Sequence, residues 1–214
     1  MEVIKPYRYL HKLDIERQAQ DVLRDVQTKR KRPVKWPPID PTIVAESLDL
    51  DVEWFAIPPD AQGSIAAMIL PLERKIVIND AISQLRGGFG QSTLAHEVGH
   101  WMLHIDRHAV GNFIERADLN IEIAVEPFLC RSLSSQQGIE WQAQYFASCL
   151  LMPRDVLEQS RKGRNLTNWN HLYPMAGEFG VTISNLTNRL QDLRWIYIPK
   201  GSNQIYLGDT GTNG

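Results

Sequence analysis

The feature that most constrains the fold of this chain is a run of histidines spaced four residues apart: His96, His100, His104 and His108. The first two belong to an H-E-x-x-H motif, in which Glu97 follows His96. Residues four apart lie about one turn apart on the same face of a helix, so the two imidazoles can meet at one cation only if the segment is helical. Apolar neighbours favour a packed helix over about residues 92–105. These neighbours are Leu94, Ala95, Val98 and Trp101.

Glu97 lies one position further round this predicted helix. From there its carboxylate can reach a water beside the metal without becoming a ligand, which is the position of a general base. We therefore predict that His96 and His100 are metal ligands and that Glu97 is the catalytic base.

A catalytic zinc site requires a third protein ligand, and we predict that this ligand is Glu140. Glu140 begins a helical pattern over residues 139–152, where it shares one face with Ala143, Gln144 and Ala147. The two alanines would let this helix approach the H-E-x-x-H helix closely. Gln144 would then hydrogen-bond a histidine ligand. Two imidazoles and one carboxylate suit Zn²⁺.

Other candidate ligands fit the expected geometry less well. Asp106 occupies the third-ligand position of a metzincin-like motif, but in that motif a glycine ends the helix at the position of Leu103. We therefore expect the helix to continue past Leu103 and to carry Asp106 away from the metal. His104 lies two turns from His96, too far for both to bind one ion, and is expected on a helix face or behind the ligands. His108 is expected at the surface. Three further carboxylates lack a supporting helical register: Glu115, Glu122 and Glu126.

Hydrophobic periodicity predicts an α+β fold with a small, mostly antiparallel sheet. The predicted strands cover residues 51–57, 64–70 and 75–79, the last two forming a hairpin, with a further strand at 127–133. The predicted helices cover residues 15–26, 40–48, 154–160 and 183–193, besides the two above. Three glycines before the H-E-x-x-H helix indicate a flexible loop: Gly87, Gly88 and Gly90.

Four regions are expected along the chain. Residues 1–41 form an N-terminal helix and linker, and residues 42–160 form the metal-binding domain. Residues 161–207 predict two helices followed by two short strands, an arrangement that resembles a winged helix. Residues 208–214 are expected to be a disordered tail.

Composition narrows the class of protein. The formal charge of −2, from 23 basic and 25 acidic residues, argues against a dedicated nucleic-acid binder. The longest apolar run, residues 65–70, is too short to cross a membrane, and residues 1–14 lack the apolar core of a signal peptide. Cys130 and Cys149 are too few for a disulfide framework, so we expect reduced thiols in a cytoplasmic protein.

Two segments together resemble the ImmA/IrrE family of metallo-endopeptidases. The first is His96-Glu97-Val98-Gly99-His100. The second is Glu140-x-x-Ala143-Gln144-x-Phe146-Ala147-x-x-Leu150-Leu151-Met152-Pro153, which is similar to the family pattern E-x-x-A-[ND]-x-F-A-x-x-L-L-x-P. Gln144 departs from the family's Asn or Asp, and the gap between the two segments is long.

This resemblance implies a zincin-like domain that binds Zn²⁺ through His96, His100 and Glu140, with Glu97 activating water. It also implies a protein substrate, a helix-turn-helix repressor whose cleavage induces mobile-element or stress genes. The residues alone leave open the group that stabilises the oxyanion. We further expect residues 64–70 to offer an edge strand to an extended peptide.

Two other functions remain open from the sequence. The winged-helix-like segment favours a DNA-binding regulator, although its second helix carries only Arg189, with Arg194 beyond it, and Asp192 opposes them. A metal-binding sensor without turnover would have the same ligands as a peptidase.

Overall fold

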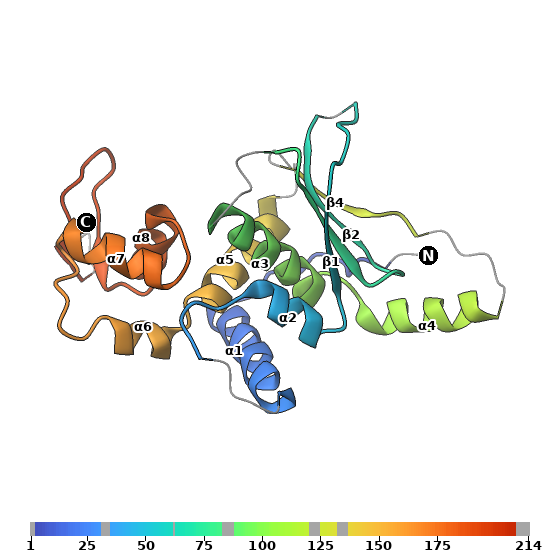
Figure 1. The fold of residues 1–214 in the computed structure, drawn as a ribbon, viewed down its shortest axis with the longest axis horizontal. Coiled ribbons are helices and arrows are strands. Elements are labelled where there is room, and N and C mark those ends of the chain that lie inside the picture. The colour runs from blue at the N-terminus through green and yellow to red at the C-terminus, as the bar shows by residue number, and fades with distance from the viewer. Residues whose placement is uncertain are drawn as a thin grey trace.

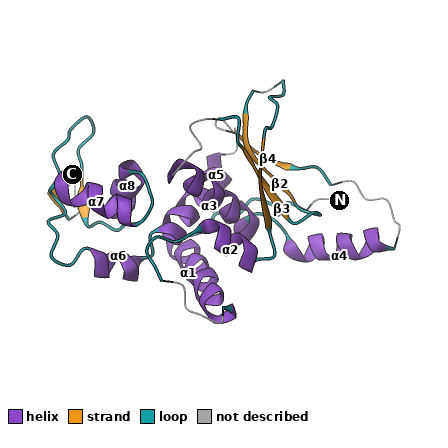
Figure 2. Ribbon diagram, viewed as in Figure 1, coloured by secondary structure: helices purple, strands orange, loops and turns teal. Residues whose placement is uncertain are grey.

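The computed structural model describes residues 3–30, 35–61, 63–82, 88–119, 125–131 and 137–208. These residues form a mixed α+β fold (Figures 1 and 2). Its described helices are α1 (Lys12–Lys29), α2 (Pro41–Ser47), α3 (Gly88–Leu103), α4 (Arg107–Asp118), α5 (Gln137–Leu151), α6 (Arg154–Ser160), α7 (Trp169–Glu178) and α8 (Ile183–Asp192). Helices α1, α2, α3 and α5 lie at the centre of the molecule, between the sheet on one side and α7 and α8 on the other (Figure 1). The predicted tail lies outside the described residues apart from Gly208.

The larger sheet contains four strands in the order β1-β3-β2-β4. The strands are β1 (Asp51–Phe55), β2 (Ile65–Leu70), β3 (Lys75–Asn79) and β4 (Phe128–Arg131). Strand β2 is antiparallel to both β3 and β4, whereas β1 is parallel to β3. The mostly antiparallel sheet and its hairpin are thus confirmed.

The prediction that residues 64–70 form an edge strand is wrong. Strand β2 lies between β3 and β4, so both of its backbone edges are already paired. The edges of the sheet are β1 and β4 instead. Pairing with β4 involves a segment about 60 residues away in the sequence, which hydrophobic alternation within residues 64–70 does not reveal.

The H-E-x-x-H helix begins earlier and ends earlier than expected. Helix α3 already includes Gly88 and Gly90, which we assigned to a loop, while Gly87 lies outside the described residues. The helix ends at Leu103 rather than continuing, because the chain there pairs with the N-terminal segment. Ile105 forms a β-bridge with Ile4.

The N-terminal segment also caps the end of α3. The Lys5 ammonium donates to the carbonyl oxygens of Met102 and Leu103, where a cation offsets the negative end of the helix dipole. Asp106 then starts α4, which the sequence did not predict, by accepting hydrogen bonds from the backbone N–H groups of His108 and Ala109. This N-terminal segment is therefore part of the folded structure around α3.

A buried ion pair fastens the C-terminal helices to the core. Arg189 of α8 is fully buried, and its guanidinium donates to the carboxylate of Glu16 in α1 at 2.6 Å. The same guanidinium donates to the carbonyl of Met152 and to the hydroxyl of Tyr145. Helices α1, α5 and α8 consequently share one hydrophobic core.

The C-terminal part contains α7, α8 and a two-stranded antiparallel sheet of β5 (Ile196–Tyr197) and β6 (Tyr206–Leu207). Thr182 caps α8 by accepting from the N–H of Asn185. The order of two helices and then two strands is the predicted one. Among the described helices, none is both long and apolar enough to cross a membrane.

Candidate metal centre

The candidate site is built where α3 and α5 pack closely. Gly99 of α3 faces the backbone of Ala143 in α5, and a methyl group on Gly99 would lie 2.9 Å from the Ala143 carbonyl oxygen. Ala143 and Ala147 are both buried. Small residues at this crossing allow the close approach that the sequence predicted, and they bring Glu140 of α5 opposite the two histidines of α3.

Three of the predicted ligand atoms converge at this crossing. His96 Nε2 lies 2.9 Å from His100 Nε2 and 3.1 Å from Glu140 Oε2, and His100 Nε2 lies 3.6 Å from the same carboxylate oxygen. Zinc bonds of about 2.0–2.1 Å at tetrahedral angles separate neighbouring ligand atoms by about 3.3 Å. These three atoms, called the ligand triangle below, are therefore spaced to fit one tetrahedral metal ion. Within the described residues, this is the group of histidine and carboxylate side chains that could hold one.

The charges at the triangle favour a cation. Burial alone would raise the pKa of Glu140, but hydrogen bonds from His100 and His96 hold this pKa well below its usual range. Burial lowers the pKa of His100 to about 4, despite the opposing effect of Glu140. Burial also acts to lower the pKa of His96, yet Glu140 and Glu97 raise it overall. The neutral imidazole of His100 can bind a metal directly, and the carboxylates that raise the pKa of His96 would equally stabilise a metal cation in place of its proton.

Glu97 and Gln144 lie beside this triangle. Glu97 is fully buried, and its negative charge acts to raise the pKa of His96. Gln144 is exposed, and its side chain acts on the His96 ring in the direction that raises the pKa of His96. The triangle itself is open on one side, since 13% of the His96 side chain and 23% of the Glu140 side chain are exposed. A ligand can approach the metal position from that side.

Behind His100 lies a second row of polar groups. His104 Nδ1 is 3.1 Å from His100 Nδ1, and His104 Nε2 is 3.0 Å from Gln142 Oε1. Phe128 of β4 covers another part of the His100 ring at a centroid distance of 4.7 Å. His104 thus lies behind the ligands, one of the two positions expected for it. Gln142 was missed, because its neighbours in the sequence give no sign that it faces α3.

The remaining candidate ligands lie apart from the triangle. Asp106 caps α4, so its separation from the site has a different cause from the continuous helix that we expected. His108, Glu115 and Glu126 are exposed and outside the cluster. Glu122 lies outside the described residues.

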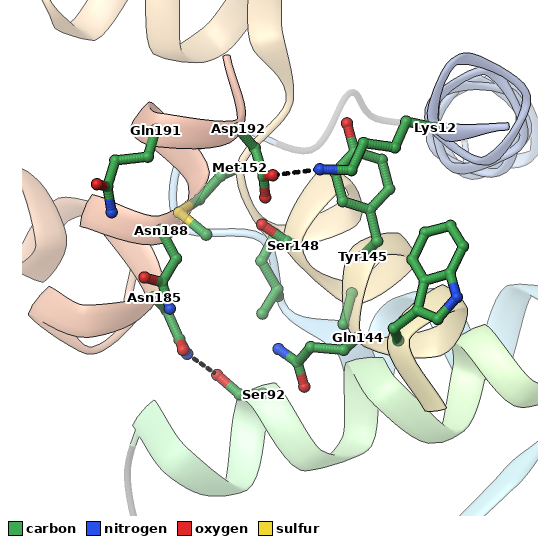
Figure 3. Close-up of a pocket in the computed structure, with 13 residues that line it drawn as sticks. Lys12, Ser92, Gln144, Tyr145, Ser148, Met152, Asn185, Asn188, Gln191 and Asp192 are labelled. Carbon is green, nitrogen blue, oxygen red and sulfur yellow. Dashed lines mark hydrogen bonds and ion pairs between the residues drawn. The ribbon is translucent and has the colours of Figure 1, made fainter. Parts of the chain in front are cut away.

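A pocket of about 510 Å³, lined by both polar and apolar side chains, opens between α5 and α8 (Figure 3). Gln144 and Ser92 line its end nearest to α3, and the amides of Asn185, Asn188 and Gln191 line the α8 wall. Asn185 Nδ2 donates to Ser92 Oγ at 2.8 Å, which links α8 to α3 one turn before His96. The pocket therefore begins next to the residues that surround the metal position.

No family model matches the sequence, and no curated protein matches it. Among solved structures, the chain is similar to a Mycobacterium tuberculosis transcriptional regulator, with 14% identity and a TM-score of 0.45. The match covers 86% of this chain and 48% of the other, so the chain spans about half the length of that regulator.

Proposed function

We propose that this protein is a zinc-dependent endopeptidase of the ImmA/IrrE type, with a zincin-like catalytic domain. The observation that carries the proposal is the convergence of His96, His100 and Glu140, with Glu97 adjacent to the first histidine on the same helix. These are the residue types and the helix geometry that metal-assisted hydrolysis requires. The resemblance in sequence adds the family and the class of substrate.

Each residue of the site would have its own role in the hydrolysis. His96, His100 and Glu140 would hold Zn²⁺, which polarises the scissile carbonyl and activates water for attack. Glu97 takes the proton of the attacking water as the new C–O bond forms, and then passes it to the nitrogen of the leaving amine as the peptide C–N bond breaks. Gln144, whose side chain raises the pKa of His96, would orient the His96 ring.

The substrate would be a polypeptide in extended conformation. Strand β4 is an edge of the sheet, and its Phe128 contacts the ring of His100. An extended peptide could add to this edge by backbone hydrogen bonds and pass the metal position, in the role first assigned to residues 64–70. The pocket between α5 and α8 would take residues on one side of the scissile bond, where the amides of Asn185, Asn188 and Gln191 could hydrogen-bond the peptide. A helix-turn-helix repressor in the cytoplasm is the proposed partner.

A DNA-binding function receives less support from the charged residues. Arg189, the one basic residue of the proposed recognition helix, is fully buried and paired with Glu16, so it cannot reach a phosphate. At the C-terminal end of α1, Lys29 donates to the carbonyl of Ser47, and Arg30 pairs with Glu46. The winged-helix-like segment is therefore proposed as a wall of the substrate site. A sensor without turnover has the same ligands and differs only in lacking cleavage.

The proposal is tested by incubating the zinc-loaded protein with helix-turn-helix repressors encoded beside its gene. We expect cleavage by the wild type and by His108→Ala, which replaces an exposed histidine outside the cluster. Glu97→Gln should retain zinc and lose cleavage. Cleavage by Glu97→Gln would refute its role as the base, and zinc binding without cleavage of any such repressor by the wild type would favour the sensor.

A further inference from the structure

A continuous row of hydrogen bonds leads away from the metal position into the protein. His100 Nδ1 and His104 Nδ1 are 3.1 Å apart, His104 Nε2 and Gln142 Oε1 are 3.0 Å apart, and Gln142 Nε2 donates to the backbone carbonyl of Arg8 at 3.0 Å. His100 and Gln142 are fully buried, and only 6% of His104 is exposed. Each polar group in the row must therefore be satisfied by its neighbour in the row.

Only one assignment of donors and acceptors satisfies every hydrogen bond in this row. The carbonyl of Arg8 can only accept, so the NH₂ group of Gln142 faces it and the amide oxygen faces His104. An amide oxygen also only accepts, so His104 carries its hydrogen on Nε2. In the neutral ring, Nδ1 of His104 is then an acceptor, and His100 must donate to it from its own Nδ1.

The metal position imposes the same arrangement from the opposite end. His100 Nε2 is the atom that faces His96 and Glu140, so this nitrogen must have a free electron pair to bind a metal. Its hydrogen must then be on Nδ1, toward His104. We infer that His104 and Gln142 are positioning residues that hold His100 in the metal-binding tautomer, with the Arg8 carbonyl as the fixed end of the row.

The Arg8 carbonyl, the fixed end of the row, belongs to the N-terminal segment, which is far from the metal site in the sequence. The backbone N–H of Lys5 donates to the carbonyl of His104, and the N–H of Asp106 donates to the carbonyl of Val3. These bonds hold the segment against the end of α3. The N-terminal residues thus contribute to metal binding although none of them is a ligand.

This inference rests on the metal site of the proposed function but not on peptide cleavage, and its readouts are ring tautomer and zinc affinity. The direct test is ¹⁵N NMR of the histidine rings in the zinc-loaded wild-type protein. We expect a protonated Nε2 and an unprotonated Nδ1 in His104, with a protonated Nδ1 in His100. The opposite tautomer of His104, or protonation of both of its nitrogens, would overturn the inference, and this measurement requires no variant to fold.

Zinc affinity of variants, measured by competition with a chelating dye, provides the second test. Removing the acceptor in His104→Leu, or the amide in Gln142→Met, should weaken zinc binding by about 10- to 100-fold, as loss of a partner behind a ligand does in other sites. His104→Asn keeps an acceptor oxygen near the position of Nδ1 and should restore most of the affinity. Equal affinities for His104→Leu and wild type, or no rescue by His104→Asn, would overturn the inference.

A matched control separates positioning from general destabilisation. Thr187 in α8 is also buried and hydrogen-bonded, through its hydroxyl to the carbonyl of Ile183. Thr187→Val therefore removes a buried polar group away from the site and should leave zinc affinity unchanged. An equal loss of zinc affinity in this control would assign the effect to stability and contradict the role of His104 and Gln142.

Discussion

Replacing Gly99 by alanine tests whether the close contact between α3 and α5 sets the metal site. The added methyl would lie 2.9 Å from the Ala143 carbonyl oxygen, 3.1 Å from the Ala143 Cα and 3.3 Å from Phe146 Cδ1. Nonbonded carbon atoms are comfortable at about 3.5–4.0 Å, so the two helices must separate by roughly 0.4 Å. Two of the three opposing atoms belong to the backbone and cannot turn aside.

The expected magnitude combines two opposing terms. Overpacking costs about 1–3 kcal/mol, while the helix preference of alanine over glycine returns about 1 kcal/mol. Gly99→Ala should therefore lower the free energy of unfolding of the metal-free protein by about 0–2 kcal/mol. Because Glu140 lies one turn before Ala143 on α5, the separation should also weaken zinc binding by about tenfold.

Gly111 in α4 provides the matched control, since a methyl group there meets no atom within 4 Å. Gly111→Ala should gain about 1 kcal/mol from helix preference and bind zinc normally. Urea denaturation measures the stabilities, and competition with a chelating dye measures the zinc affinities. If Gly99→Ala is stabilised as much as Gly111→Ala and keeps its zinc affinity, the role of the close contact is refuted.

Three further predictions concern the core and the pocket. Glu16→Gln leaves the buried Arg189 without its counter-charge and should lower the free energy of unfolding by about 3 kcal/mol in urea denaturation; a loss below about 1 kcal/mol would contradict the buried pair. Burial raises the pKa of the Cys149 thiol to about 12. In a Cys130→Ser chain, iodoacetamide at pH 8 should therefore label Cys149 only after unfolding, and rapid labelling of the native protein would disprove its burial. Asn188→Lys adds a positive charge to the α8 wall of the pocket and should raise KM for a repressor substrate without changing zinc affinity; an unchanged KM would exclude the pocket from substrate binding.

Local patterns predicted the parts of the fold that depend on neighbouring residues. Hydrophobic alternation placed the strand at residues 75–79 where β3 occurs, and the helix predicted over residues 40–48 occurs as α2, which starts at Pro41 and is capped by Asp40. The register of α5 likewise predicted that Glu140 and Gln144 face the histidines of α3. Each of these inferences needs only the periodicity of one element.

Long-range contacts determine the features that the sequence did not reveal. The end of α3 and the start of α4 follow from pairing of Ile105 with Ile4, about 100 residues away in the chain. The position of β2 inside the sheet depends on its pairing with β4. The role of Gln142 depends on the carbonyl of Arg8, 134 residues before it. No spacing within one helix or strand carries this information.

The central claim, a metal centre formed by His96, His100 and Glu140, is tested most directly by metal analysis of dialysed protein. Wild type and His108→Ala should each retain one zinc ion per chain after dialysis against buffer with trace zinc. Glu140→Ala should lose most of its zinc, because one corner of the ligand triangle is removed. Equal zinc content in wild type and Glu140→Ala would contradict the proposed centre.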